Sequence, residues 1–251
     1  MKKGLITLIG LCILSIYQIS YANTPIGQVI WSAGAITARQ PAEAARILAR
    51  HSPIYTHDML STSNNGTGQI AFTDNSVLSL QKDTVVKLDQ YQFGGNVAPQ
   101  KDAFVIAVIK GGFRTITGTI SKNNPGGYQA TTPVATIGVR GTMYSVYFNL
   151  KKTNMAAKLD KGSIVISNKK GDVTLKKCGA KDVGCHDKLF SIVEGVNSAP
   201  QIITFEPDVF KNEPALIPII QSFCLAPKAK PRPCLEGSQC PGSSMPKKSA
   251  P

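Results

Sequence analysis

The adjacent residues His57 and Asp58 are the pair in this sequence that comes nearest to acid–base chemistry. A histidine base needs a nucleophile in a motif such as G-x-S-x-G, or a second histidine in H-E-x-x-H that holds a metal ion. Neither motif accompanies this pair. We therefore interpret Asp58 as a turn residue that caps backbone N–H groups, and we predict no catalytic residue and no enzymatic activity.

Two other polar groupings have residue types that bind metal ions, but neither has the required pattern. Asp74-Asn75-Ser76 offers too few acidic oxygens for a calcium loop. Cys178, Cys185 and His186 form a C-x6-C-H arrangement that matches none of the usual short zinc-binding spacings. We predict neither a metal site nor a cofactor.

Five cysteines lie in the last third of the chain: Cys178, Cys185, Cys224, Cys234 and Cys240. In an oxidising compartment such clustering indicates disulfides that stabilise a region with little core of its own. Because the number is odd, one thiol is left free or pairs with another chain. The sequence does not define the pairing.

A single arginine interrupts the apolar stretch TTPVATIGVRGTMYSV at residues 131–146. Ile137 and Val139 share one side of the expected strand, so Arg140 points to the other side. The apolar positions change parity after Gly141, which predicts a β-bulge at that glycine.

Arg140 has two interpretations. We favour a structural pin, in which the five donors of the guanidinium tie several turns together, with Asp58 or Asp74 as candidate partners. The alternative is a contact for an external anion. The hydroxyls of Thr132 and Thr142 could complete either arrangement.

Aromatic residues offer a second candidate surface. Trp31 and Tyr144 share a face with other apolar residues and are predicted to lie in the core. This leaves Tyr91, Phe93 and Tyr147 as a candidate ligand surface, of the kind that stacks on a glycan.

The elements that must position these residues are predicted to be β-strands over residues 26–175. Short runs of β-branched and aromatic residues alternate with turns rich in Gly, Asn and Asp. Residues 104–109 are apolar on both faces, as in a strand buried on both sides. Residues 110–116 and 161–166 each begin with a lysine–glycine turn. The spacing fits a sandwich, a barrel or a β-solenoid, and the pattern does not choose among them.

Residues 1–22 have the three parts of a secretory signal peptide: a basic start, an apolar run and small residues before Asn23. The apolar run is shorter than the ~20 residues of a spanning helix. We therefore predict an exported bacterial protein, periplasmic or secreted, with no transmembrane segment after cleavage. Beyond the signal peptide we expect a β domain at 23–175, a cysteine-containing extension at 176–223 and a basic tail at 224–251 that is rich in proline, lysine and cysteine.

The net charge favours anionic partners. Removal of Lys2 and Lys3 with the signal peptide lowers the formal charge from +13 to +11. Such a protein associates in a salt-dependent way with anionic surfaces such as phospholipid or lipopolysaccharide phosphates. Export argues against nucleic acid as the partner.

Residues 27–148 resemble the FecR domain, a module of the bacterial envelope. Five motifs carry the resemblance in order: Gly27-x-Val29 with Gly34; His57-Asp58-Met59-Leu60-Ser61-Thr62, where the family usually has Gly-Asp-x-Leu-x-Thr; Asp74-Asn75-Ser76-Val77-Leu78-Ser79-Leu80, where it usually has Asp-Gly-Ser-x-Leu-x-Leu; Gly112-Phe113-Arg114; and Thr132-Pro133 followed by Val139-Arg140-Gly141-Thr142. The closing motif is the most specific of the five.

The resemblance implies an all-β, solenoid-like fold, and the strand spacing keeps a sandwich-like domain as the alternative. The composition after residue 176 predicts a loop-rich C-terminal region that contains cysteine and proline. Founding members of the family are membrane-spanning regulators that receive a signal in the periplasm and control a sigma factor in the cytoplasm. This sequence has no cytoplasmic helical domain, so the resemblance implies the sensing or binding module alone, with an envelope protein or glycan as partner. The alternative is a scaffold protein that its basic, cysteine-bearing tail holds to the envelope.

Overall fold

The computed structural model describes residues 23–211 apart from 96, 98, 179–186 and 188. The chain divides into two compact units, Met1–Ile217 and Pro218–Pro251, and the second lies outside the described residues. The predicted signal peptide, the basic tail and four of the five C-terminal cysteines also lie outside them, so those interpretations stay predictions. Within the described ranges, no helix is long and apolar enough to cross a membrane.

The described part of the first unit is mostly β-structure, which confirms the predicted all-β fold. Its strands are β1 (Gly27–Ala33), β2 (Ile36–Arg39), β3 (Arg46–Ile47), β4 (Pro53–Ile54), β5 (Met59–Thr62), β6 (Thr67–Phe72), β7 (Val77–Leu80), β8 (Val85–Gln92), β9 (Ala103–Ile116), β10 (Tyr128–Thr131), β11 (Thr136–Asn149), β12 (Asn154–Asn168), β13 (Gly171–Lys176), β14 (Phe190–Glu194) and β15 (Gln201–Ile203). The helical elements are α2 (Thr119–Asn123) and the 3-10 turns η1 (Pro99–Lys101), η2 (Pro125–Gly127) and η3 (Asp208–Phe210).

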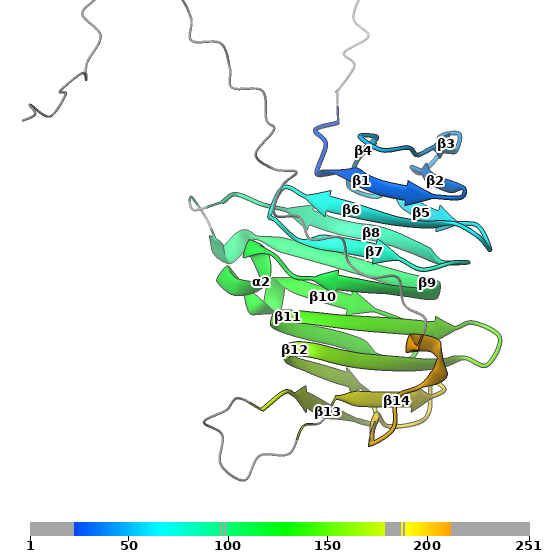
Figure 1. Cartoon of the computed structure of the whole chain (residues 1–251). Helices are drawn as coiled ribbons and strands as arrows, with labels where there is room; N and C mark the ends of the chain where they lie inside the picture. The colour runs from blue at the N-terminus through cyan, green and yellow to red at the C-terminus, as the bar shows by residue number, and fades with distance from the viewer. Residues whose placement is uncertain (1–22, 96, 98, 179–186, 188, 212–251) are drawn as a thin grey trace, which may run out of the picture. The chain divides into compact units, whose positions relative to one another are not determined.

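All strands belong to one hydrogen-bonded sheet that folds over into two layers. Layer one contains β3, β2, β5, β8, the first half of β9, β10, the first half of β11, the second half of β12, and β13. Layer two contains β4, β1, β6, β7, the second halves of β9 and β11, the first half of β12, β14 and β15. Figure 1 shows the strands following one another from β1–β4 to β13–β14.

Three long strands pass from one layer to the other at a glycine. Gly111 in β9, Gly141 in β11 and Gly162 in β12 have φ angles of 74°, 60° and 87°. This left-handed backbone is costly for residues that carry a Cβ, so glycine is the residue that permits the corner. The lysine–glycine turns seen in the sequence at residues 110 and 161 are therefore corners between the layers.

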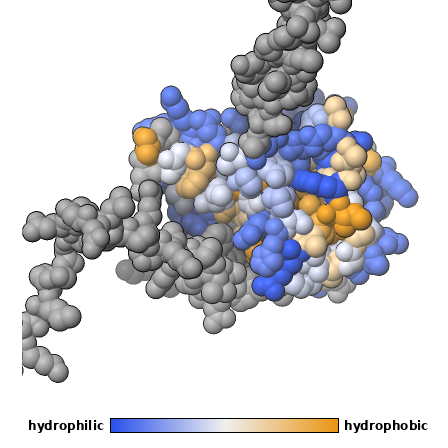
Figure 2. Space-filling model, turned by 90° about the horizontal axis from the view of Figure 1, so that it is seen from above, coloured by the Kyte–Doolittle hydropathy of each residue, from blue (hydrophilic) through white to orange (hydrophobic). Residues whose placement is uncertain are grey.

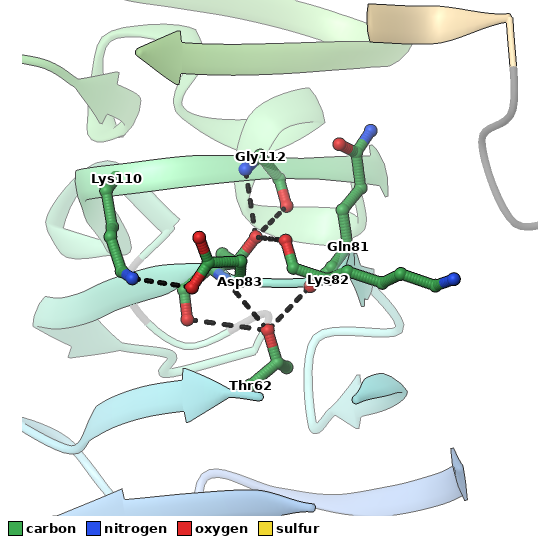
Figure 3. Close-up of polar contacts among 7 residues, drawn as sticks. Thr62, Gln81, Lys82, Asp83, Lys110 and Gly112 are labelled. Atoms are coloured by element: carbon green, nitrogen blue, oxygen red, sulfur yellow. Dashed lines mark hydrogen bonds and ion pairs between the residues drawn. The ribbon is translucent and has the colours of Figure 1, made fainter. Parts of the chain in front are cut away.

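Threonine hydroxyls connect neighbouring turns at the corner that contains Gly111 (Figure 3). The Thr62 hydroxyl donates to the Gln81 carbonyl at 2.6 Å and accepts the Thr84 N–H at 2.9 Å. The Thr84 hydroxyl in turn accepts the Gly112 N–H at 2.9 Å. Because these groups are buried, each bond satisfies a backbone polar group that the bend would otherwise leave unpaired.

The core lies between the layers as a single cluster of buried side chains. Phe72 of layer two meets Phe104 of layer one with ring centroids 4.7 Å apart, and Phe104 also packs edge-on against Tyr128 at 5.2 Å. Alternate residues of each strand point into this core, as the period of a β-strand requires. Tyr144 is fully buried as predicted, whereas Trp31 is only half-buried because the β1–β6 register shifts between Val29 and Trp31.

The surface at the β1–β4 end of the sheet carries both hydrophilic and hydrophobic side chains. Figure 2 looks onto this end, where hydrophilic side chains surround small hydrophobic patches. Ile47 of the short strand β3 is 82% exposed. Isolated exposed apolar residues are common on folded proteins, so this end alone identifies no site.

Candidate functional site

The two aspartates of the central motifs lie in buried turns. Asp58 is fully buried, accepts the Tyr55 N–H at 2.8 Å and pairs with Arg46, whose guanidinium lies 5.0 Å from the Tyr55 ring centre. The neighbouring His57 has φ = 68°. A glycine adopts this conformation without strain, which explains why FecR domains usually have glycine at this position.

Asp74 organises a second turn. Its carboxylate accepts the Ser76 N–H at 3.0 Å and the Ser76 hydroxyl at 2.5 Å, and Asn75 between them has φ = 66°. Asparagine tolerates this left-handed conformation better than most residues. The Tyr91 hydroxyl accepts the Asp74 N–H at 2.9 Å. Burial, with the neighbouring Asp74 charge, raises the pKa of Tyr91 above its usual value.

The predicted aromatic surface is not a free platform. Tyr91 and Phe93 pack against the core cluster, and the Tyr91 ring lies 5.0 Å from Phe104 and 5.8 Å from Phe72. Tyr147 is half-buried on the outer face of layer two. The three residues therefore do not form one surface for stacking.

The threonines of the closing motif make local hydrogen bonds. The Thr132 hydroxyl accepts the Ala135 N–H at 3.1 Å in the turn before β11, with Pro133 exposed beside it. This turn lines a shallow pocket of about 410 Å³ together with Asn168 and Lys169.

Thr142 is buried at the Gly141 corner. Its N–H donates to the Thr117 hydroxyl at 2.8 Å, and its carbonyl accepts the Thr117 N–H at 3.0 Å. Arg114 of the fourth motif forms an ion pair with Asp160 at 2.9 Å, and both side chains are largely buried. Thr142 thus ties β11 to the segment after β9, and Arg114 connects β9 with β12 across the intervening β11.

Arg140 is not the structural pin that we predicted. It is exposed, and in the described part of the chain it has neither an ion pair nor a hydrogen bond. Asp58 and Asp74, its expected partners, are occupied by Arg46 and by Ser76. The physical reason is the strand register: Arg140 occupies an outward position at the end of its half of β11, just before the chain turns at Gly141.

Arg140 lies among other cations, which we call the basic corner: Arg140, Lys161, Lys176 and Lys177. Arg140 pairs in register with Ser163, which pairs with Lys176, so the side chains of Arg140 and Lys176 point to the same face. Two strand spacings separate them, or about 10 Å. Lys177 adjoins Gly162 through an N–H···O bond of 3.3 Å.

The described acids near this corner, Asp160 and Asp187, do not pair with Arg140. The Asp160 carboxylate pairs with Arg114, and Asp187 accepts the Cys178 N–H at 2.7 Å. The surface beside Arg140 is also open, because a Cβ atom added to Gly138 or Gly141 would meet nothing within 4 Å. The arrangement is suited to contact an anion from outside.

Cys178 is the one C-terminal cysteine within the described residues, and it is disulfide-bonded. Its partner lies outside the described residues, so the pairing of all five cysteines stays a prediction. In the ranges that the structure describes, no three His, Cys, Asp or Glu side chains cluster as metal ligands.

Residues 58–174 match the family model described as FecR protein. Over these residues the chain is similar to the FecR domain. The match begins at Asp58 and ends within β13, so the basic corner from Arg140 to Lys161 falls inside the domain and Lys176 and Lys177 lie directly after it. The strands β1–β4 precede the matched residues and continue the same sheet.

Two crystal structures of a "putative anti-sigma factor" from Parabacteroides distasonis ATCC 8503 resemble the chain, with TM-scores of 0.44 and 0.43 and 15% sequence identity. Each similarity covers 58% of this chain and 58% of that protein. No curated protein matches the sequence.

Sequence reasoning missed most of the basic corner. The lysine–glycine turn at residues 161–162 was a usable signal, since it repeats the pattern of residues 110–111. Lys176 and Lys177 gave no signal of their own, because only the pairing of β12 with β13 brings them beside Arg140.

Proposed function

We propose that this protein is a non-enzymatic, exported module of the bacterial envelope, which senses or binds an acidic segment of a protein partner through the basic corner. The observation that carries the proposal is the state of Arg140. A family-motif arginine is exposed and unpaired within the described chain, although the aspartates of the other motifs are all buried in polar contacts. An arginine that stabilised the fold would be expected to have such contacts.

The corner at Gly111 provides a direct comparison with the corner at Gly141. Lys110 precedes Gly111 as Arg140 precedes Gly141, and Lys110 forms an ion pair with Asp83 at 2.7 Å (Figure 3). Among the residues that the structure describes, Arg140 has no equivalent acid. A partner carboxylate would take the place that Asp83 takes at the first corner, and arginine can bind it with two parallel hydrogen bonds.

A protein segment fits this surface better than an isolated anion. Of the strands described, β13 pairs only with β12, so its other backbone edge is available to an extended chain. Lys176 ends β13 and lies at the basic corner. For its carboxylates to reach Arg140, an acidic segment held at this edge would also have to cross the outer face of β13 and β12, which lie between the edge and Arg140.

The test uses the full chain in the native envelope with a photo-crosslinking residue in place of Val165, which is 41% exposed and in register with Gly138. We expect one defined protein adduct that weakens at least tenfold in the double variant Arg140→Gln/Lys161→Gln. The matched control is Lys82→Gln/Lys110→Gln, which removes two charges at the other corner and should keep the adduct. Equal adducts in both variants, or an adduct with glycan alone, would refute the proposed contact.

A further inference from the structure

The Thr132-Pro133 motif takes no part in the basic corner, and it forms one wall of the pocket of about 410 Å³ on the outer face of layer one. The other walls are the turn between β12 and β13, at residues 167–169, and the segment after β14, at residues 196–197. Pockets that bind small molecules enclose roughly 300–1,000 Å³. This pocket is therefore large enough for one small organic ligand.

The side chain of Asn168 holds the three walls together. Its amide nitrogen donates to the Val134 carbonyl at 3.1 Å and to the Ser198 carbonyl at 2.8 Å, while its oxygen accepts the Lys170 N–H at 2.8 Å. The Ser198 hydroxyl in turn donates to the Glu194 carbonyl at 2.6 Å. Because these bonds fix the walls before a ligand arrives, binding costs little conformational entropy.

The strands of the pocket contribute two hydroxyl groups side by side. Thr136 of β11 and Ser167 of β12 are directly opposite each other in the strand register, and both are half-buried. Their neighbours Ile137 and Ile166 are buried in the core, so the two hydroxyl-bearing side chains point outward. The Thr132 hydroxyl is used within its own turn, whereas neither of these two hydroxyls has a hydrogen-bond partner among the described residues. Each can therefore donate to a ligand and accept from it.

The turns of the pocket add one charge and two apolar surfaces. Lys169 is exposed, and it is the one charged residue among the described residues that line the pocket. Asn197 adds a side-chain amide, while the exposed Pro133 and the 55% exposed Val196 offer aliphatic carbon. These groups together match a ligand that combines hydroxyls, an aliphatic surface and a negative charge.

We propose that this pocket, which we call the sugar pocket, binds a sugar unit that carries a carboxylate. A pyranose has hydroxyls at its edge and C–H groups on its faces, so it uses the hydroxyls of Thr136 and Ser167 together with the apolar surface of Pro133. Its carboxylate lies toward Lys169. An inorganic anion would leave the apolar walls unused, and a purely apolar ligand would leave the two hydroxyls covered without a partner, at a cost in affinity.

The sugar pocket is separate from the basic corner. Thr136 precedes Arg140 by four residues on β11, which corresponds to about 13 Å along a strand. Each site can therefore be removed without the other, and failure of one proposal leaves the other standing.

An NMR titration of the full chain tests the chemistry of the ligand with sodium glucuronate, sodium galacturonate, glucose and sodium acetate. We expect at least one uronate to bind about tenfold more tightly than acetate, which lacks the hydroxyls. The same uronate should bind about threefold more tightly than glucose, which lacks the carboxylate, because the charge of Lys169 is exposed. Absence of binding by both uronates, or equal binding of uronate and acetate, would overturn the proposal.

Two matched variants assign the binding to the sugar pocket. Thr136→Val/Ser167→Ala removes both hydroxyls and should weaken uronate binding about tenfold. The control is Thr37→Val/Ser61→Ala, a threonine–serine pair in register on β2 and β5 that is likewise half-buried on the outer face of layer one. The control should keep the affinity of the parent. Equal affinities of the two variants for uronate would overturn the assignment.

A surface variant serves if the hydroxyl variant fails to fold, which a thermal melt would reveal. Lys169→Gln changes an exposed side chain and should abolish the preference for uronate over glucose, whereas Arg140→Gln/Lys161→Gln at the basic corner should retain it. A preference that survives Lys169→Gln would contradict the placement of the carboxylate.

A galacturonate trimer distinguishes two sources of the same sugar. Tighter binding of the trimer than of the monomer would make a glycan chain the source, and equal affinities would make it the free sugar. Either result supports the sugar pocket when Thr136→Val/Ser167→Ala weakens it, and overturns the sugar pocket when that variant leaves it unchanged.

Discussion

Gly162 approaches Gly141 so closely that a Cβ atom on Gly162 would lie 2.7 Å from the Gly141 carbonyl oxygen. The two residues are the corners of adjacent strands, β12 and β11, and both have left-handed φ angles. The corners therefore stack directly on each other where the chain passes between the layers. This contact explains why two long strands can bend at the same place and remain paired on both sides of the bend.

Substitution of these two glycines separates backbone strain from steric contact. Gly141→Ala adds only the strain of a left-handed residue, about 1 kcal/mol, because a Cβ there meets nothing within 4 Å. Gly162→Ala adds the close contact as well, and we expect a loss of about 2–4 kcal/mol in the free energy of unfolding. Urea denaturation of the two variants measures the difference. Equal losses would show that the stacked corners relax freely.

Removal of Arg46 should destabilise the fold more than removal of Arg140. Arg46→Ala leaves the fully buried Asp58 carboxylate without its ion-pair partner, and we expect a loss of about 2 kcal/mol. Arg140 is exposed and makes no polar contact with the described chain, so Arg140→Ala should change stability by less than about 0.5 kcal/mol. Thermal melts of the two variants check this order, and a larger loss for Arg140→Ala would restore the structural-pin interpretation.

The sequence was sufficient to predict the strands, the turns and the bulge at Gly141, because these depend on local patterns, and five ordered motifs carried the resemblance to the FecR domain. Alternating apolar residues mark the strands, and the parity change at Gly141 marks a bend that the structure has at φ = 60°. The pattern did not predict that the bend joins two layers, since that depends on which strands pair on each side of Gly141.

Contacts between distant residues could not be predicted in this way. Arg46 and Asp160 carried no motif, yet they pair with Asp58 and Arg114. Small polar residues such as Ser79 resemble solvent-facing positions in the sequence, although Ser79 is 1% exposed. Burial of an outward side chain depends on contacts with residues distant in sequence, which strand periodicity does not record.

Stability should fall steeply in alkali because buried tyrosines resist ionisation. Burial raises the pKa of both Tyr128 and Tyr144 above the usual value for tyrosine. Above about pH 10 the unfolded state releases the protons of these tyrosines, while the folded state keeps them. The two tyrosines therefore contribute fully to the free energy of unfolding below that pH, and this contribution is lost as the pH rises further. Denaturant unfolding at pH 9 to 11 should show this decline.

Phenylalanine variants test whether the buried tyrosines cause the loss of stability at alkaline pH. Tyr144→Phe removes one buried ionisable group, so the free energy of unfolding of the variant should fall less steeply above pH 10 than that of the parent. An identical slope in the variant and the parent would contradict the assignment.

The Thr84 hydroxyl should be essential to the Gly111 corner through its hydrogen bonds rather than its shape. Thr84→Val keeps the branched side chain but leaves the Gly112 N–H, which donates to Thr84 at 2.9 Å, without its acceptor. Loss of a partner by a buried donor costs about 1–3 kcal/mol, and the Gly112 carbonyl also loses a hydroxyl donor at 3.0 Å. Thr84→Ser keeps the hydroxyl and loses a methyl group, so it should cost about 1 kcal/mol. Urea unfolding distinguishes the two variants, and a greater loss for Thr84→Ser would mean that packing, rather than hydrogen bonding, holds this corner.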